Sequence, residues 1–232
     1  MGSFMEGRPS DSPYVQGIWR GYTEGLYTPV CPAAAEWDLL MVRRNSRVIV
    51  SFEGPLTRAK FKYQTDDQEF CVIRFAAGTF LPYLPVRKFL DTDTILPEGS
   101  HKSFWLDGST WEFPSFENVE TFVSRLVREE VLQRDPVVSA VLQDQPHDLS
   151  FRTIRRRFLN ATGLTQGAIH QIARAQRAAT LLQEGVPILD VVYLAGYADQ
   201  PHLTRALKHF MGQTPAQIAR ESLPDDQLAI AE

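Results

Sequence analysis

Two spacings of apolar residues divide this chain. From about Tyr14 to Trp111, apolar residues occur in short runs that are rich in β-branched and aromatic side chains. Turn-forming residues such as Arg44-Asn45-Ser46 separate these runs, which predicts β-strands in a mainly antiparallel sheet or barrel. The clearest runs are residues 36–42 (EWDLLMV), 46–53 (SRVIVSFE), 59–64 (AKFKYQ) and 69–78 (EFCVIRFAAG). From Phe116 the apolar residues recur every three or four positions, which predicts helices.

The first predicted helix is amphipathic and ends before Asp135-Pro136. Its apolar side consists of Val119, Phe122, Val123, Leu126, Val127 and Val131. This helix either connects two halves of the protein or pairs with its copy in a second chain. Asp135 can cap a second helix, which runs to Gln143, with Pro136 in its first turn, where a missing N–H costs nothing.

Capping residues and glycines then predict four more helices. Ser150 caps a helix that buries Ile154 and Phe158, and Gly163 ends it. Thr165 caps a longer helix that ends near Gly185. Its predicted inward residues are Ile169, Ile172, Ala173, Ala179 and Leu182. Helices over 188–195 and 199–209 follow, joined by a turn at Gly196, and this succession is typical of helix-turn-helix modules.

These patterns predict an α+β chain. We expect a mainly antiparallel β domain over 1–115 and a helical connector over 116–146. An all-α domain over 147–222 would contain two helix-turn-helix units joined by a long helix. Residues 223–232 would form a flexible tail.

Charge supports this division. The chain has a formal net charge of −4, yet residues 147–222 carry nine Lys or Arg against five acids. That region therefore has a net charge of +4 and the remainder −8, and it is the local charge that governs phosphate contacts. The last predicted helix turns polar and basic side chains outward while Leu203 and Leu207 face inward. The outward residues Gln200, His202, Thr204, Arg205 and Lys208 suit base edges and phosphates.

A basic helix lies about fifty residues upstream of that helix. It carries Arg152, Arg155, Arg156 and Arg157 within six residues. A solvated surface explains either helix taken alone, but the repetition favours DNA binding. Two recognition helices separated by roughly 34 Å could enter successive major grooves on one side of a duplex.

The run from Leu149 to Arg220 closely resembles the DNA-binding domain of AraC/XylS-type transcriptional regulators. Its most diagnostic part, GYADQPHLTRALKHFMGQTP, has the Gly-aromatic turn, the polar recognition helix and the closing Gly-x-Thr-Pro of that family. The resemblance implies base or phosphate contacts by two sets of residues, Arg152, Arg155 and Arg156 in the first unit, and Gln200, Pro201, His202, Thr204 and Arg205 in the second. Family members have a longer segment before the first recognition helix, so here the helix from Pro136 to Gln143 would support an abbreviated first unit.

The N-terminal half is similar to the β-rich domain of a subgroup of the same family. The stretches CPAAAEWDLLMV, FEGPLTRAKF and VIRFAAGTFLPYLPV carry this resemblance, although Ala34-Ala35-Glu36 stands where the subgroup often has Asp-Gly. It implies a sensor or dimerisation role. Aromatic side chains could border an apolar effector pocket, although packing explains them equally well: Trp19, Trp37, Tyr63, Trp105 and Trp111. Arg74 or Glu36 could orient the effector.

The expected function is that of a regulator that binds a double-stranded DNA operator and responds to a small-molecule effector. Further expected partners are a second copy of the chain in a homodimer and, for an activator, RNA polymerase. The alternative is a small-molecule-binding or enzymatic β domain whose helical part serves only interaction. The five histidines are scattered, and no nucleophile, metal-ligand or phosphate-loop spacing occurs, so we expect no enzyme, metal or cofactor. No apolar run reaches eighteen residues and the N-terminus is unlike a secretory signal, which favours a cytoplasmic protein without a membrane partner.

Overall fold

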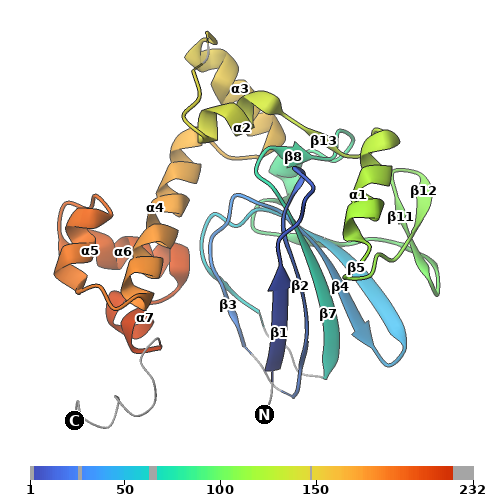
Figure 1. The fold of residues 1–232 in the computed structure, drawn as a ribbon, viewed down its shortest axis with the longest axis horizontal. Coiled ribbons are helices and arrows are strands. Elements are labelled where there is room, and N and C mark those ends of the chain that lie inside the picture. The colour runs from blue at the N-terminus through green and yellow to red at the C-terminus, as the bar shows by residue number, and fades with distance from the viewer. Residues whose placement is uncertain (1–2, 26–27, 63–66, 147, 222–232) are drawn as a thin grey trace. The chain divides into compact units, whose positions relative to one another are not determined.

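A computed structural model describes residues 3–25, 28–62, 67–146 and 148–221. The order of its elements confirms the predicted fold class, with antiparallel strands first and helices afterwards (Figure 1). The strands are β1 (Ser3–Arg8), β2 (Val15–Thr23), β3 (Val30–Cys31), β4 (Asp38–Arg44), β5 (Arg47–Glu53), β6 (Lys60–Phe61), β7 (Gln68–Phe75), β8 (Thr79–Phe80), β9 (Asp93–Ile95), β10 (Glu98–Ser100), β11 (Ser103–Leu106), β12 (Ser109–Glu112) and β13 (Gln133–Arg134). The helices are the 3-10 turn η1 (Val86–Phe89) and α1 (Val119–Arg128), α2 (Pro136–Leu142), α3 (Phe151–Ala161), α4 (Gln166–Gln183), α5 (Ile188–Leu194), α6 (Gln200–Met211) and α7 (Pro215–Glu221).

The chain divides into two compact units that do not follow the sequence order. Unit 2 combines residues from 29–34 and 56–62 with those from Gly167 onward, and unit 1 holds the rest. Helix α3 therefore belongs to unit 1 and α6 to unit 2. The predicted domain limits at 115, 146 and 222 remain predictions, and the predicted tail over 223–232 lies outside the described residues.

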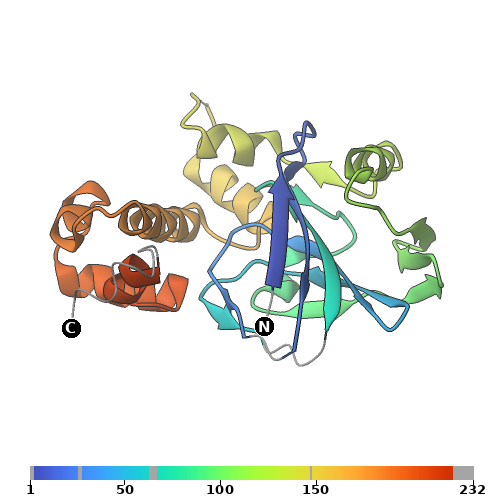
Figure 2. The ribbon, with the colours of Figure 1, turned by 60° about the horizontal axis from the view of Figure 1, so that its bottom comes forward.

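Unit 1 is built on a six-stranded antiparallel sheet with the strand order β1-β2-β7-β4-β5-β9 (Figure 2). The predicted turn between β4 and β5 is present, with positive φ angles at Asn45 (46°) and Ser46 (67°). Two successive residues with positive φ form a turn whose twist matches that of the strands, so this hairpin is tight. Strand β1 lies before the predicted strand region, and its pairing with β2 decides its conformation.

Helix α1 covers one end of the core of unit 1, beside β11 and β12 (Figure 1). Its buried residues Val119, Phe122, Val123 and Leu126 join the core together with Trp111. The apolar side of α1 is therefore packed against the core of its own chain. The helix is also shorter than predicted, because Glu130 takes a φ of 59° and the buried Val131 lies beyond the end of the helix.

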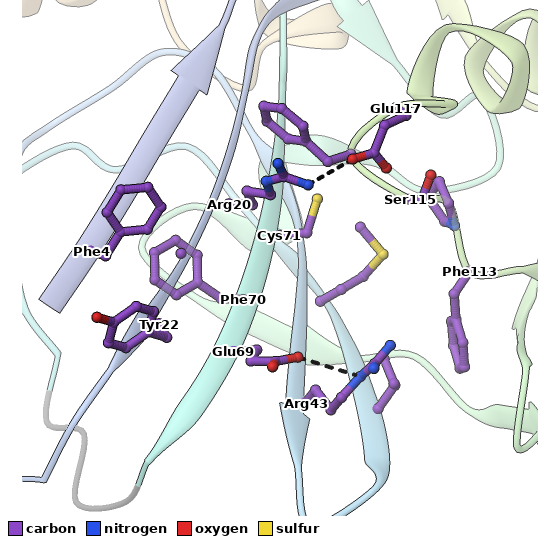
Figure 3. Close-up of a pocket in the computed structure, with 15 residues that line it drawn as sticks. Phe4, Arg20, Tyr22, Arg43, Glu69, Phe70, Cys71, Phe113, Ser115 and Glu117 are labelled. Carbon is purple, nitrogen blue, oxygen red and sulfur yellow. Dashed lines mark hydrogen bonds and ion pairs between the residues drawn. The ribbon is translucent and has the colours of Figure 1, made fainter.

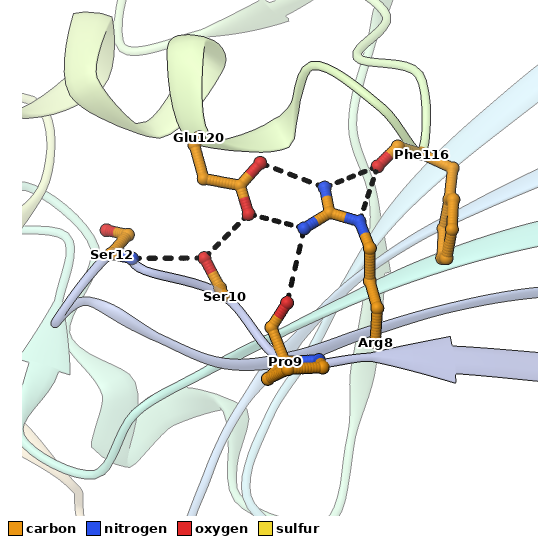
Figure 4. Close-up of polar contacts among 6 residues, drawn as sticks. All are labelled: Arg8, Pro9, Ser10, Ser12, Phe116 and Glu120. Atoms are coloured by element: carbon orange, nitrogen blue, oxygen red, sulfur yellow. Dashed lines mark hydrogen bonds and ion pairs between the residues drawn. The ribbon is translucent and has the colours of Figure 1, made fainter.

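A polar network holds the start of α1 against the end of β1 (Figure 4). Arg8 donates to both carboxylate oxygens of Glu120, at 2.6 and 2.9 Å, and to the backbone oxygen of Phe116. Ser10 donates a further hydrogen bond to Glu120 at 2.9 Å. The hydrogen bond from Arg8 is the main reason that the pKa of Glu120 falls to about 2, because it stabilises the ionised carboxylate.

Unit 2 has a core formed by α4, α5, α6 and α7. In α4 the buried positions are Ile169, Ile172, Ala175, Ala178, Ala179 and Leu182. The prediction that Ala173 faces inward was wrong, since this residue is exposed. A residue one position after Ile172 is rotated by about 100° around the helix axis and leaves the buried stripe.

In the part of the chain that the structure describes, no helix is long and apolar enough to cross a membrane.

Candidate nucleic-acid interface and ligand pocket

Helix α6 has strong local signals at both ends. Asp199 caps it, because its Oδ1 accepts a hydrogen bond of 2.6 Å from the backbone N–H of His202. Pro201 lies in the first turn, where a missing N–H is tolerated. Gly212 ends the helix with a φ of 75°, a conformation that suits glycine. Leu203 and Leu207 are fully buried, which fixes the side that the helix turns outward.

The outward side of α6 presents polar and basic side chains. Gln200, Pro201, Arg205 and Lys208 are exposed, and Thr204 is half-buried. Within the described part of the chain, the side chains of Gln200, Thr204, Arg205 and Lys208 form no hydrogen bond or ion pair. They are therefore available to phosphates and base edges.

The turn before α6 is held by a residue that sequence reasoning did not single out. Gly196 has a φ of 70°, as a steep turn between helices requires. Arg174 of α4 donates to the backbone oxygen of Gly196 at 3.4 Å, and its guanidinium lies 4.5 Å from the ring centre of Tyr197. His202 packs edge-on against the same ring at 5.1 Å. His202 therefore also supports the turn, unlike the exposed residues of α6.

Helix α3 exposes positively charged side chains. Ser150 caps it by accepting a hydrogen bond from the N–H of Thr153, and Ile154 and Phe158 are buried as predicted. Three arginines are exposed and, within the described residues, have no partner: Arg152, Arg155 and Arg156. As predicted, α2 packs against α3.

Arg157 differs from the other three arginines of α3. It is half-buried and donates to both carboxylate oxygens of Asp135, at 3.3 and 3.1 Å. The same carboxylate caps α2 by accepting from the N–H groups of Val137 and Val138. Arg157 thus joins α2 to α3, and the exposed arginines remain the candidates for phosphate contact.

The predicted ligand aromatics are not brought together. Trp37 and Trp111 are core residues, with 4% and 1% of their surface exposed, and their indole N–H groups donate to the backbone oxygens of Thr79 and Leu106. Trp105 is 43% exposed. Trp19 lies across Gly7 and Gly17, so close that a Cβ on either would meet its ring at 2.6 Å. Tyr63 lies outside the described residues.

Arg74 and Glu36, the two residues that we expected to orient an effector, have other surroundings in the structure. Arg74 forms a two-point ion pair with Asp38, at 2.9 and 2.8 Å. Burial raises the pKa of Glu36 above its usual value. Neither residue lines the pocket described next.

That pocket is a groove of about 390 Å³ on unit 1 (Figure 3). None of the four predicted tryptophans lines it. Its walls come from β1, β2, β7, β4 and β5 and from the segment before α1: Phe4, Arg20, Gly21, Tyr22, Met41, Arg43, Val48, Glu69, Phe70, Cys71, Phe113, Pro114, Ser115, Phe116 and Glu117. Strand register explains this grouping, because Tyr22 lies opposite both Phe4 and Glu69, and Glu69 lies opposite Arg43. Sequence reasoning missed these residues, because the strand register that brings them together cannot be read from the sequence.

The groove is mostly apolar with charged groups at its sides. Arg20 donates to Glu117 at 2.6 Å and to Glu6, whereas Arg43 lies 3.9 Å from Glu69, too far for a hydrogen bond. Burial raises the pKa of Cys71 to about 11, so its thiol stays protonated and unreactive near neutral pH. Among the described residues, no cluster of His, Cys, Asp and Glu could hold a metal ion.

Comparisons with known proteins identify the C-terminal region. Residues 148–221 match the family model described as a helix-turn-helix domain. The HTH-type transcriptional regulator RipA from Corynebacterium diphtheriae is 36% identical over 74 residues, which are 32% of this chain and 22% of RipA. The chain thus spans about a fifth of the length of the curated relative that it matches.

Solved structures of ToxT from Vibrio cholerae are similar over most of the chain. One is 11% identical, covers 95% of this chain and 98% of ToxT, and has a TM-score of 0.43. Another, with unsaturated fatty acid bound to wild-type ToxT, is 10% identical, covers 94% of each chain and has a TM-score of 0.40. The family match and the RipA match show that the chain contains a helix-turn-helix domain at residues 148–221, and its Gly-Tyr turn and closing Gly-Gln-Thr-Pro resemble those of AraC-type DNA-binding domains.

Proposed function

We propose that the whole chain is a transcriptional regulator that binds a specific double-stranded DNA site through α6 and α3. The observation that carries this is the outward side of α6. It places Gln200, Thr204 and Arg205, which can pair with base edges, on a helix whose orientation is fixed by buried leucines and a held turn. Helix α3 would add phosphate contacts through its exposed arginines.

Selection of double-stranded DNA from a random pool by the full chain tests this proposal. A regulator of this kind enriches one sequence motif, and the enrichment persists when salt is raised within the range that weakens non-specific binding. Enrichment of no motif, or a preference that vanishes with moderate salt, would leave the alternative in which the helical part serves only interaction.

We further propose that the groove of unit 1 binds the effector. The support is its size and its lining, in which aromatic residues such as Phe4, Tyr22 and Phe116 surround a few charged groups. Cavities of small-molecule sites combine an apolar wall with a few polar groups in this way. Arg43 has the loosest ion pair there, so the ligand class is a small, largely apolar molecule with one anionic or hydrogen-bond-accepting group.

The fluorescent anion 1-anilinonaphthalene-8-sulfonate is a suitable probe, because it combines an aromatic body with one negative group. The full chain should bind it saturably, and Val48→Trp should abolish this binding by filling the groove. Ile49→Trp is the matched control, since successive residues of a strand point to opposite faces. Equal binding by the two variants would place the probe elsewhere and count against the groove.

A further inference from the structure

The C-terminal end of the recognition helix α6 is completed by two segments from the β-rich half of the sequence. The N–H of Ala33 donates to the backbone oxygen of Phe210 at 2.7 Å, and the N–H of Ala59 donates to that of His209 at 2.9 Å. The last four carbonyl groups of a helix have no partner within it, so these two bonds satisfy groups that α6 cannot satisfy itself. We name residues 29–34 and 56–62 together the clasp.

The two segments of the clasp are hydrogen-bonded to each other, and the clasp also accepts a hydrogen bond from α4. Its two segments pair through β3 and β6 and through mutual backbone hydrogen bonds between Ala34 and Leu56, at 3.0 and 2.9 Å. Gln176 of α4 donates to the backbone oxygen of Ala33 at 3.0 Å. The clasp therefore belongs to unit 2 by its contacts, although it comes from the β-rich half by sequence.

The clasp is also joined directly to the groove by the chain. Its first segment ends at residue 34, four residues before β4, and its second begins at residue 56, three residues after β5. The tight β4–β5 hairpin between them supplies Met41, Arg43 and Val48 to the groove. One hairpin thus lines the groove at its tip and continues into the clasp at both of its ends.

We propose that the clasp is the route by which occupancy of the groove controls α6. A ligand against the β4–β5 hairpin would change the hold of Ala33 and Ala59 on the last turn of α6, and with it the affinity of that helix for DNA. This proposal rests on the groove being the effector site and on α6 being the reader.

Gly212 provides a sharp way to open the clasp. An added Cβ there would meet the Cγ1 of Val30 at 2.8 Å and the Cβ of Ala59 at 3.1 Å. Gly185 is the matched control, because it lies in the same unit with a φ of 82° and an added Cβ would meet nothing within 4 Å. Gly212→Ala and Gly185→Ala therefore share the backbone strain, and only the first presses on the clasp. Gln176→Leu is a milder second opening, since it removes the bond to Ala33.

The first measurement is amide hydrogen exchange in the full chain without DNA. Gly212→Ala and Gln176→Leu should speed exchange at Ala33 and Ala59, and Gly185→Ala should not. Val48→Trp, which fills the groove, should change exchange at the same two amides, whereas Ile49→Trp should not. Unchanged exchange at both amides in Val48→Trp overturns the proposal, and this result does not depend on DNA binding.

The second measurement is affinity for the selected DNA site. Val48→Trp should change it by roughly 5-fold or more, the lower end of typical couplings between sites. The change should shrink to under about 2-fold in the Gly212→Ala background and persist in the Gly185→Ala background. A change that persists in both backgrounds overturns the route through the clasp. Selection of no DNA motif by the wild-type chain would instead refute the proposed function, while the exchange measurement still decides on the clasp.

Discussion

Helices α3 and α6 occupy corresponding places in two helix-turn-helix units, yet they are built differently. Helix α3 exposes three arginines and is fixed within unit 1 by Arg157 and Asp135. Helix α6 exposes a mixture of Gln, Thr, Arg and Lys and is fixed within unit 2 by the turn at Gly196 and by the clasp. Uniform positive charge suits phosphates and mixed hydrogen-bonding groups suit bases, so the comparison suggests affinity from one helix and specificity from the other.

The largest effect is expected from removing the charge of α3. The triple variant Arg152→Ala, Arg155→Ala and Arg156→Ala should weaken binding to all DNA sequences by roughly a hundredfold at 0.15 M salt, because each phosphate contact contributes ~0.9 to the salt slope. Titrations at several salt concentrations measure this as a slope reduced by about 3. Arg47→Ala, which removes an exposed arginine from β5, is the control. A loss confined to one sequence would show that α3 also reads bases.

The next effect concerns specificity. Arg205→Ala should cost about 1–3 kcal/mol on the selected site and relax the preference at one base pair, because a bidentate arginine contact discriminates between bases. Competition between the selected site and its single-base variants measures this. Lys208→Ala on the same helix should instead weaken all sequences equally. Unchanged affinity and preference in Arg205→Ala would remove α6 from the role of reader.

Alanine substitutions at the glycines that follow α3 and α5 test how closely the chain packs at each of these two helix ends. Gly163 and Gly196 both have positive φ, at 74° and 70°, so alanine at either should cost about 1–2 kcal/mol of stability. Alanine at Gly163 should cost more, because its Cβ would lie 3.1 Å from Leu90 and 3.3 Å from the backbone of Arg87, whereas nothing lies within 4 Å at Gly196. Urea unfolding of both variants measures the difference. Equal losses would contradict the close packing of the end of α3 in unit 1.

The smallest effect is a pH dependence within unit 1. The pKa of Glu120 is lowered from 4.5 to about 2 in the folded chain, so the ionised carboxylate stabilises the fold above about pH 4.5. That contribution is lost as the pH falls from 4.5 to about 2. In Glu120→Gln, the free energy of unfolding should therefore change less with pH over this range, as urea unfolding at a series of pH values would measure. Ser10→Ala, which removes one weaker bond, should reduce this pH dependence less. The same dependence of the free energy of unfolding on pH in the wild type and in Glu120→Gln would refute a stabilising role of the Arg8–Glu120 pair.

Local signals explain what could be predicted from the sequence. Asp135 and Ser150 cap their helices as predicted, and Gly196 has the positive φ expected of its turn. Caps and turns depend on residues within three or four positions, so their chemistry can be read from a short stretch. The same holds for the exposed face of α6, because the spacing of Leu203 and Leu207 sets which side is buried.

The groove and the clasp could not be read in this way. The groove collects residues between Phe4 and Glu117 whose grouping depends on strand register, and a slip of one residue would turn each of them to the other face. This is also why the predicted tryptophans scatter between the core and the surface. The clasp depends on the backbone N–H groups of Ala33 and Ala59. Backbone hydrogen bonds of this kind leave no pattern of side chains in the sequence.

The sequence by itself determined that strands precede helices, the N-terminal caps of α2 and α3, the positive charge of 147–222 and the outward side of α6, because each follows from neighbouring residues. Only the tertiary structure decided that α3 belongs with the β-rich unit, that the groove lies at the β4–β5 hairpin, and that residues 29–34 and 56–62 complete α6. Those arrangements rest on backbone hydrogen bonds and packing between residues far apart in the chain, and side-chain patterns along a sequence carry little information about either.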